Sequence, residues 1–126
     1  CILNSHTDGT PAMNNPVPLF LHWTGFLKWV LQKTGKFPKN VRFTLSSRID
    51  NLALDVLEEV IVAQYEKDRL PALRRISISI DKLRVLLRIC HELGHLDHKG
   101  YEYAARNLDE AGRMTGGWVK QARQAG

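Results

Sequence analysis

The chain has 126 residues, of which 44% are hydrophobic and 25% are charged. This length suits one domain with a real core, not a catalytic domain plus a recognition domain, and the composition excludes intrinsic disorder. The formal net charge of +5 and a pI of about 9.5 favour polyanionic partners such as nucleic acid or an acidic protein surface. No apolar run reaches the length of a membrane span, so a soluble, cytoplasmic protein without a membrane partner is expected.

The first 15 residues differ from the rest of the chain. They are rich in small and polar residues and begin with Cys1 instead of Met, which predicts a tail that is flexible or derived from an expression vector. Residues 16–126 are expected to form a single domain. Because Cys1 stands in the predicted tail and Cys90 in a predicted helix, we expect reduced thiols and no disulfide between them.

Four helices are predicted along the chain, and no strand pattern persists. The first starts at Pro16 to Pro18 and ends at Thr34-Gly35, and the second runs from Pro38 to Tyr65. The third starts at Pro71 and stops between Gly94 and Gly100, and the fourth follows directly. Because the connections are short, these elements predict an all-α, antiparallel up-down-up-down four-helix bundle.

Apolar residues at spacings of three and four define the core face of each predicted helix. In chain order they are Leu19, Phe20, Trp23, Phe26, Leu27, Val30 and Leu31; Val41, Leu45, Ile49, Leu52, Val56 and Val60; Leu73, Ile76, Ile80, Leu83, Leu87, Cys90 and Gly94; and Tyr101, Ala104, Ala105, Leu108, Ala111, Gly112, Thr115, Trp118, Val119 and Ala122.

The second and third predicted helices carry a further apolar stripe away from the core face. A helix that is apolar on two sides has to bury both, so we expect self-association through this second stripe. The alternative is that a thick core or the N-terminal tail covers it. The predicted interface residues are Phe43, Leu54, Ile61, Ile78, Val85 and Ile89.

The string His91-Glu92-Leu93-Gly94-His95 matches the HExxH pattern, in which two histidines one helical turn apart bind zinc and the glutamate activates water. The metzincin continuation fails, because His98 and Tyr101 stand where it requires Gly and His. A third ligand from Glu102, Asp109 or Glu110 would require the fourth helix to turn a polar residue toward the site. Helix-surface histidines near a C-terminus are also favourable to the helix dipole. We therefore predict no metal site, no catalytic residue and no cofactor, with a small zinc metallohydrolase as the alternative.

Basic residues are concentrated in the last two predicted helices. In the third helix, only Asp81 and Glu92 oppose the arginines. The fourth helix has a cation every seven residues from Lys99, which would form a track for phosphates. The alternative is a solvated face held by weak ion pairs at i,i+4 spacing. The predicted nucleic-acid or partner-binding residues are Arg74, Arg75, Arg84, Arg88, Arg106, Arg113 and Lys120.

Tryptophans and glycines complete the pattern. The tryptophans are expected to pack in the core or an interface instead of stacking on bases; they are Trp23, Trp29 and Trp118. Glycines in the fourth helix cost roughly 1 kcal/mol each relative to Ala, so we interpret them as allowing close helix approach, with a frayed helix end as the alternative. These glycines are Gly112, Gly116 and Gly117.

Several segments resemble one four-helix-bundle family. They are Phe37-Pro38-Lys39, Arg42-Phe43-Thr44-Leu45, Leu86-Leu87-Arg88 with Glu92-Leu93 and, most specifically, Leu108 to Trp118 (LDEAGRMTGGW). The family contains the accessory variability determinant proteins of diversity-generating retroelements and the proteins encoded in intervening sequences of ribosomal RNA genes. The resemblance covers residues 37–120.

The resemblance implies a homopentameric barrel of four-helix bundles that binds RNA or DNA and associates with a reverse transcriptase. It also implies that this subunit performs no catalysis. A scaffold that binds protein alone is a further interpretation of the same residues.

Overall fold

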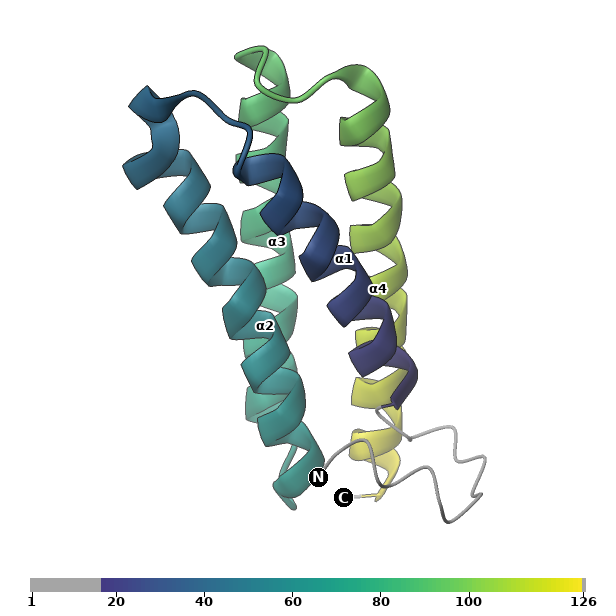
Figure 1. Ribbon diagram of the computed structural model, residues 1–126. Helices are drawn as coiled ribbons and strands as arrows, with labels where there is room; N and C mark the ends of the chain where they lie inside the picture. Colours follow the sequence, from purple (N-terminus) through teal and green to yellow (C-terminus); the bar gives the residue numbers. More distant parts are fainter. Residues whose placement is uncertain (1–16, 126) are drawn as a thin grey trace.

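The computed structural model describes residues 17–125, so the predicted tail of residues 1–15 lies outside the described part of the chain. The described residues form four α-helices and no strand, and Figure 1 shows how the helices are arranged. The all-α prediction is therefore confirmed as a four-helix bundle. The elements are α1 (Val17–Thr34), the short turns η2 (Lys39–Val41) and η3 (Arg42–Ser46), α2 (Ser47–Tyr65), α3 (Leu70–Glu92) and α4 (His98–Ala125).

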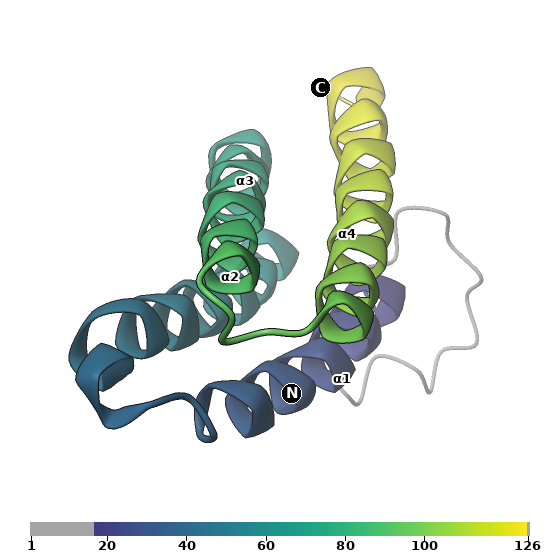
Figure 2. The same ribbon diagram turned by 90° about the horizontal axis from the view of Figure 1, so that it is seen from above.

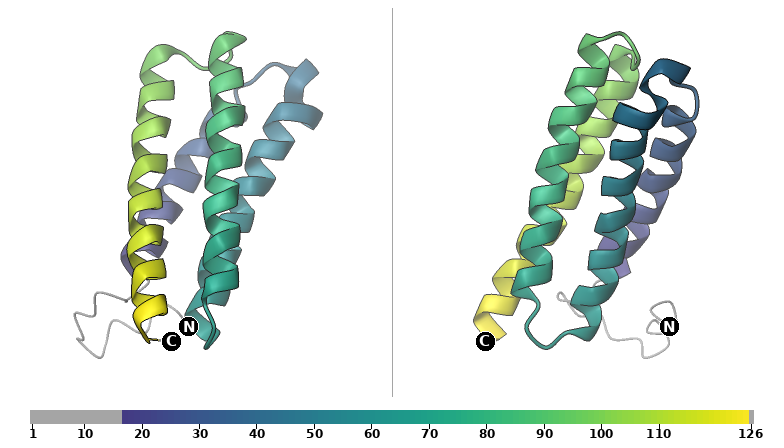
Figure 3. Two further views of the ribbon diagram at one scale, coloured as in Figure 1. Left: turned by 180° about the vertical axis from the view of Figure 1, so that it is seen from behind. Right: turned by 90° about the vertical axis from the view of Figure 1, so that its left-hand side faces the viewer.

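The helices surround one shared core. Helix α2 packs against α1 and α3, and α4 packs against α3 and α1, an arrangement that Figure 2 shows from above. The connections from α1 to α2 and from α3 to α4 lie at the upper end of Figure 1, and the turn from α2 to α3 lies at the lower end, as both views in Figure 3 also show. None of the described helices is long and apolar enough to cross a bilayer.

The core contains the apolar stripes predicted from helical spacing. Trp23 is fully buried, and its indole Nε1–H donates a hydrogen bond of 2.8 Å to the carbonyl oxygen of Ala53, which ties α1 to α2. The pairing removes the cost of burying an indole N–H without a partner. Leu31, predicted on the same stripe, is 40% exposed, because it lies at the edge of the α1 face near the helix end.

The second predicted helix starts later than expected. Residues 39–46 form a 3-10 turn and then a π turn, in which the N–H of Ser47 bonds to the carbonyl of Arg42, five residues back. Neither turn fully buries an apolar side chain, and Phe43 is 86% exposed. The α-helical register is therefore not enforced by packing until Ile49 enters the core, and the prediction of one helix from Pro38 is wrong.

The glycines predicted to allow close helix approach in α4 do not serve that role. A Cβ on Gly112 would lie 3.6 Å from Nη2 of Arg84, whereas a Cβ on Gly116 or Gly117 would meet nothing within 4 Å. Because 3.6 Å is an ordinary van der Waals distance, the prediction that these glycines allow close helix approach is wrong for all three within the described chain. A frayed end is also wrong, because α4 continues to Ala125 and Trp118 is buried.

Candidate nucleic-acid and assembly surfaces

The four helices differ in charge. Helix α2 contains one arginine against four acidic residues, a formal charge of −3. In contrast, α3 has five basic residues against two acidic ones, and α4 has five against three, giving +3 and +2. Helix α1 adds two lysines and no acid. The positive charge of the described bundle is therefore distributed over three helices, and α2 is its acidic side.

The basic residues predicted on α3 do not form one continuous face. Arg75 contacts Glu59 of α2 with a nitrogen-to-oxygen distance of 2.9 Å, and this hydrogen bond raises the pKa of the Arg75 guanidinium. Arg84 instead forms an ion pair with Asp109 of α4. The structure thus directs these two arginines toward opposite neighbouring helices. Arg88 is exposed and lies 3.3 Å from Glu92 on its own helix.

The cations predicted on α4 lie on its exposed side. Arg106 lies 3.9 Å from Glu102, and Arg113 pairs with Glu110, which raises the pKa of the Arg113 guanidinium through their hydrogen bond. Surface pairs of this kind contribute about 0–1 kcal/mol, so a phosphate can replace the carboxylate at little cost. Within residues 17–125, no acidic side chain lies within ion-pair distance of Arg74 or Lys120, and both are exposed.

The predicted assembly residues lie where a second molecule could reach them. Ile61 is half-buried, and the others are exposed: Phe43, Leu54, Ile78, Val85 and Ile89. Ile78 borders a groove of about 330 Å³ between α2 and α3. Acidic residues of α2 line one side of this groove and Arg75 and Lys82 of α3 line the other. The α2–α3 side therefore combines exposed apolar side chains with charges of both signs.

The HExxH string does not lie on one helix. Helix α3 ends at Glu92, and Gly94 takes a φ of 87°, a backbone conformation that favours glycine. The N–H of Gly94 donates to the carbonyl of His91, and the N–H of His95 donates to the carbonyl of Cys90. These two bonds form a Schellman cap. The expectation that His91 and His95 occupy adjacent turns of one helix is therefore wrong, as is the placement of Gly94 on the buried face of α3.

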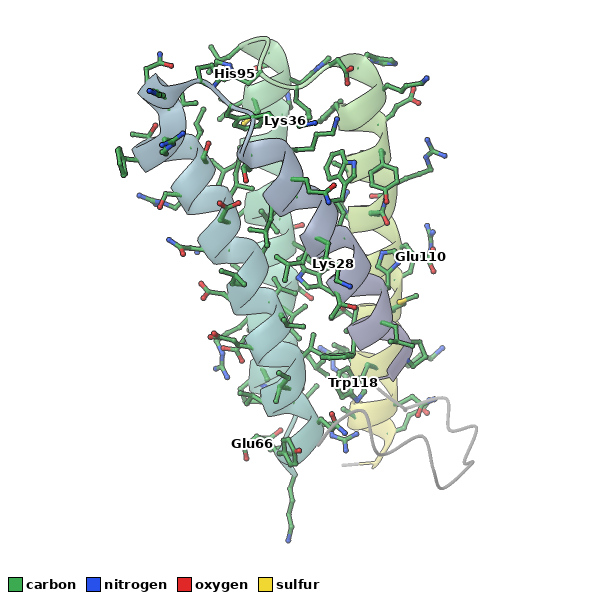
Figure 4. The ribbon with its side chains drawn as sticks, in the orientation of Figure 1. Lys28, Lys36, Glu66, His95, Glu110 and Trp118 are labelled. Atoms are coloured by element: carbon green, nitrogen blue, oxygen red, sulfur yellow. The ribbon has the colours of Figure 1, made fainter. Side chains whose placement is uncertain are left out.

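The histidines of this region make structural contacts instead. His91 stacks on Tyr101 with ring centroids 4.8 Å apart, and its Nδ1 lies 2.9 Å from the carbonyl oxygen of Leu96. His95 packs beside Phe37, at the end of the bundle where Figure 4 also labels Lys36. Nε2 of His98 lies 3.0 Å from Oε2 of Glu102. The described residues contain no group of three or more metal-ligating side chains arranged to hold an ion.

A surface feature that the sequence did not reveal lies between α1 and α4. Trp29 and Tyr103 pack with ring centroids 4.8 Å apart, and the ammonium of Lys33 lies 5.6 Å from the centroid of the Trp29 ring. Trp23 and Trp118 are buried as predicted, whereas Trp29 is only half-buried. Helical spacing could not separate Trp29 from the core tryptophans, because its exposure depends on where α4 lies.

Comparison with known families gives one match. The family model described as bAvd-like, for the bacterial accessory variability determinant, matches residues 22–122. The matched range begins in α1 and ends in α4, and therefore includes all four helices. No curated protein and no solved structure matches the chain significantly.

Proposed function

Because the chain belongs to the bAvd-like family, we propose that it is a non-catalytic accessory protein of a diversity-generating retroelement that binds nucleic acid and the reverse transcriptase. The family is one of accessory proteins, and the match over residues 22–122 is the observation that carries the proposal. The cytoplasm, where nucleic acid and a reverse transcriptase meet, is its proposed compartment.

The proposed assembly is a homopentamer whose subunit is a single-domain, antiparallel up-down-up-down bundle. Two features support contacts through the α2–α3 side: its exposed apolar residues and its two signs of charge. The acidic α2 of one copy would face the basic α3 of the next, a head-to-tail contact that generates a closed ring when the rotation fits. Each subunit would keep its own hydrophobic core in the assembly, so assembly would need no unfolding.

The proposed nucleic-acid surface is electrostatic and independent of sequence. The exposed cations of α4 recur every seven residues, which places them roughly 10 Å apart along the helix. They are Lys99, Arg106, Arg113 and Lys120. Contacts of this kind release counterions from the phosphates, so affinity falls steeply as the salt concentration rises.

A salt titration tests the proposed surface. We expect the wild-type protein to bind structured RNA and duplex DNA in low salt. The double variant Arg106→Ala/Arg113→Ala should bind both nucleic acids more weakly. If both residues contact phosphates of duplex DNA, the slope of log affinity against log salt should become shallower by about 1.8. A matched control removes the same two charges elsewhere, with Arg48→Ala/Lys67→Ala at exposed positions.

The titration has clear outcomes. A shallower slope for the α4 variant and an unchanged slope for the control support the surface. Equal slopes for both variants would show that the net charge and not α4 determines binding, which contradicts the assignment. If the wild-type protein retains neither nucleic acid in low salt but still binds the reverse transcriptase, it acts as a protein scaffold and the nucleic-acid part of the proposal is wrong.

A further inference from the structure

A shallow hollow opens between the end of α1 and the start of α4. Its volume is about 240 Å³, below the roughly 300–1,000 Å³ of pockets for drug-sized ligands, so it suits a single ring system. Trp29 and Lys33 line it from α1, and Lys99, Gly100 and Tyr103 line it from α4, with Asp97 preceding the helix. No part of the HExxH string and none of the seven predicted cations lines this hollow.

The aromatic side of the hollow packs against the core and is partly exposed to solvent. The Trp29 ring stacks on Phe26, with an interplanar angle of 15° and centroids 5.8 Å apart, and Phe26 is buried in the core. On its other side Trp29 meets Tyr103, which is 41% exposed. Burial of these aromatic surfaces is therefore incomplete within the subunit. Trp29 thus holds Tyr103 from behind, and the exposed part of the Tyr103 ring provides a surface on which a further flat ring can stack.

The charged side chains of the hollow are two lysines and one aspartate. Lys33 lies over the Trp29 ring, and Lys99 is exposed at the start of α4. The aspartate has a structural role, because Oδ1 of Asp97 accepts a hydrogen bond of 2.7 Å from the N–H of Gly100 and so caps the helix. Two cations against one engaged carboxylate leave the hollow positive. Figure 4 labels two further lysines on the same segment of the chain, Lys28 on α1 and Lys36 just after it.

The position of the hollow connects it to the α4 cations. Lys99 is one of the hollow's lysines and also the first member of the seven-residue series that continues through Arg106. A strand whose phosphates follow α4 would therefore reach the aromatic rings at the end of its path. An acidic protein surface would use these cations, but would leave the exposed aromatic rings without a matching group. A nucleotide uses both, because its base is flat and its phosphate is an anion.

We infer that the Trp29–Tyr103 hollow binds an unpaired base of single-stranded RNA or DNA, with the adjacent phosphates on Lys33 and Lys99. This inference rests on the proposed nucleic-acid binding and specifies the chemistry that the α4 cations alone do not explain. Duplex nucleic acid offers phosphates but no free base faces, so the hollow should distinguish single strands from duplexes of equal charge.

The experiment compares two oligonucleotides with the same phosphates. One is a 12-residue oligo(dA), and the other carries abasic sites throughout. We expect fluorescence anisotropy to show that the wild-type protein binds oligo(dA) at least about fivefold more tightly, since one stacked base contributes about 1–3 kcal/mol. Tyr103→Ala should remove most of this preference, and Tyr103→Phe should keep it because the ring remains. Arg106→Ala/Arg113→Ala should weaken the binding of both oligonucleotides by the same factor.

A second readout is independent of any loss of folding at Tyr103. A base stacked on Tyr103 lies beside the Trp29–Tyr103 ring pair and should quench part of the tryptophan fluorescence when oligo(dA) is added, and Trp29→Phe should abolish the quenching while circular dichroism remains that of a helical protein. The abasic oligonucleotide should quench neither protein.

Three results would overturn the inference. Equal wild-type affinity for the two oligonucleotides would show binding through phosphates alone. This result contradicts base binding in the hollow but leaves the proposed function intact. Failure to bind either oligonucleotide in low salt would contradict the inference, and failure to bind structured RNA and duplex DNA as well would also contradict the proposed nucleic-acid binding. If Tyr103→Ala binds oligo(dA) normally but no longer binds the reverse transcriptase, the hollow takes a protein partner and not a base.

Discussion

The hydroxyl of Thr34, the last residue of α1, donates a hydrogen bond of 2.7 Å to Oδ1 of Asp50, in the first turn of α2. Burial raises the pKa of the Asp50 carboxyl, although the hydrogen bond from Thr34 acts in the opposite direction. A raised pKa means that the folded protein holds this proton more tightly than the unfolded chain does. The stability contributed by the protonated group is fully present below the unfolded pKa, near 3.9, and is lost as the pH rises through the folded pKa.

Asp50→Asn should therefore gain stability relative to the wild-type protein as the pH rises. Asparagine keeps an oxygen that can accept the hydrogen bond from Thr34 but never acquires a charge. We expect urea unfolding at several pH values between about 4 and 7 to show the free energy of unfolding shifting in favour of the variant toward the upper end. A difference that stays constant across this range, or shifts in favour of the wild-type protein, would contradict the assignment.

Cys90 should be unreactive in the folded protein. Its side chain is fully buried in α3, and burial raises the pKa of its thiol to about 11. Since the thiolate is the nucleophile, iodoacetamide at pH 8 should leave Cys90 unmodified in buffer and alkylate it in guanidinium chloride. Peptide mapping distinguishes Cys90 from Cys1. Equal labelling of Cys90 in both conditions would show that the α3 core opens readily.

Two glycine substitutions should have opposite effects on stability. Gly94→Ala places a side chain at a φ of 87°, which costs about 1 kcal/mol even though no atom lies within 4 Å of the added Cβ. Gly116→Ala is the matched control, because its added Cβ also meets nothing but lies in the interior of α4. Urea unfolding should show a stabilisation of up to about 1 kcal/mol for this variant.

The same measurement can contradict the interpretation of either glycine. A neutral Gly94→Ala would mean that the Schellman cap does not hold the end of α3. A destabilised Gly116→Ala would mean that something outside the described chain approaches α4 at this point, and comparison at two protein concentrations would show whether it is another copy.

An introduced charge on the α2–α3 side should prevent assembly without unfolding the subunit. Val85 is 59% exposed, so Val85→Glu removes little from the core, but it places a charge in the proposed contact. Leu21→Glu is the control, since Leu21 is 55% exposed on α1. Native mass spectrometry should show pentamers for the wild-type protein and Leu21→Glu, and monomers for Val85→Glu. Pentamers for all three proteins would exclude Val85 from the interface.

Helical spacing predicts most of the fold because each core face is continuous. Helix α1 ends at Thr34 as predicted, and the burial of Trp23, Ile76 and Leu108 follows from apolar periods alone. The turns before α2 could not be predicted, because Val41 and Leu45 keep helical spacing although neither is fully buried. Spacing shows which residues could share a face, whereas packing decides the register.

The candidate surfaces are less predictable, since their geometry depends on contacts between helices. Gly94 begins the predicted stop of α3, yet the HExxH pattern spans it, and the two interpretations cannot both hold for one helix. The partners of Arg75 and Arg84 lie 16 and 25 residues away in the sequence, on different helices. The exposed edge of Trp29 likewise depends on the position of Tyr103, so neither surface follows from one helix considered alone.

The acidic α2 among three basic helices gives the bundle a transverse dipole moment. Copies that meet through α2 and α3 would place the negative pole of each subunit within a contact, and a ring built in this way would expose mainly its positive poles. Repulsion between those poles would oppose ring closure, and a bound polyanion would screen it. By thermodynamic linkage, ring closure would then raise the affinity for the polyanion by the same factor by which the polyanion favours closure. The negative charge of a single helix would thus couple ring closure to polyanion binding.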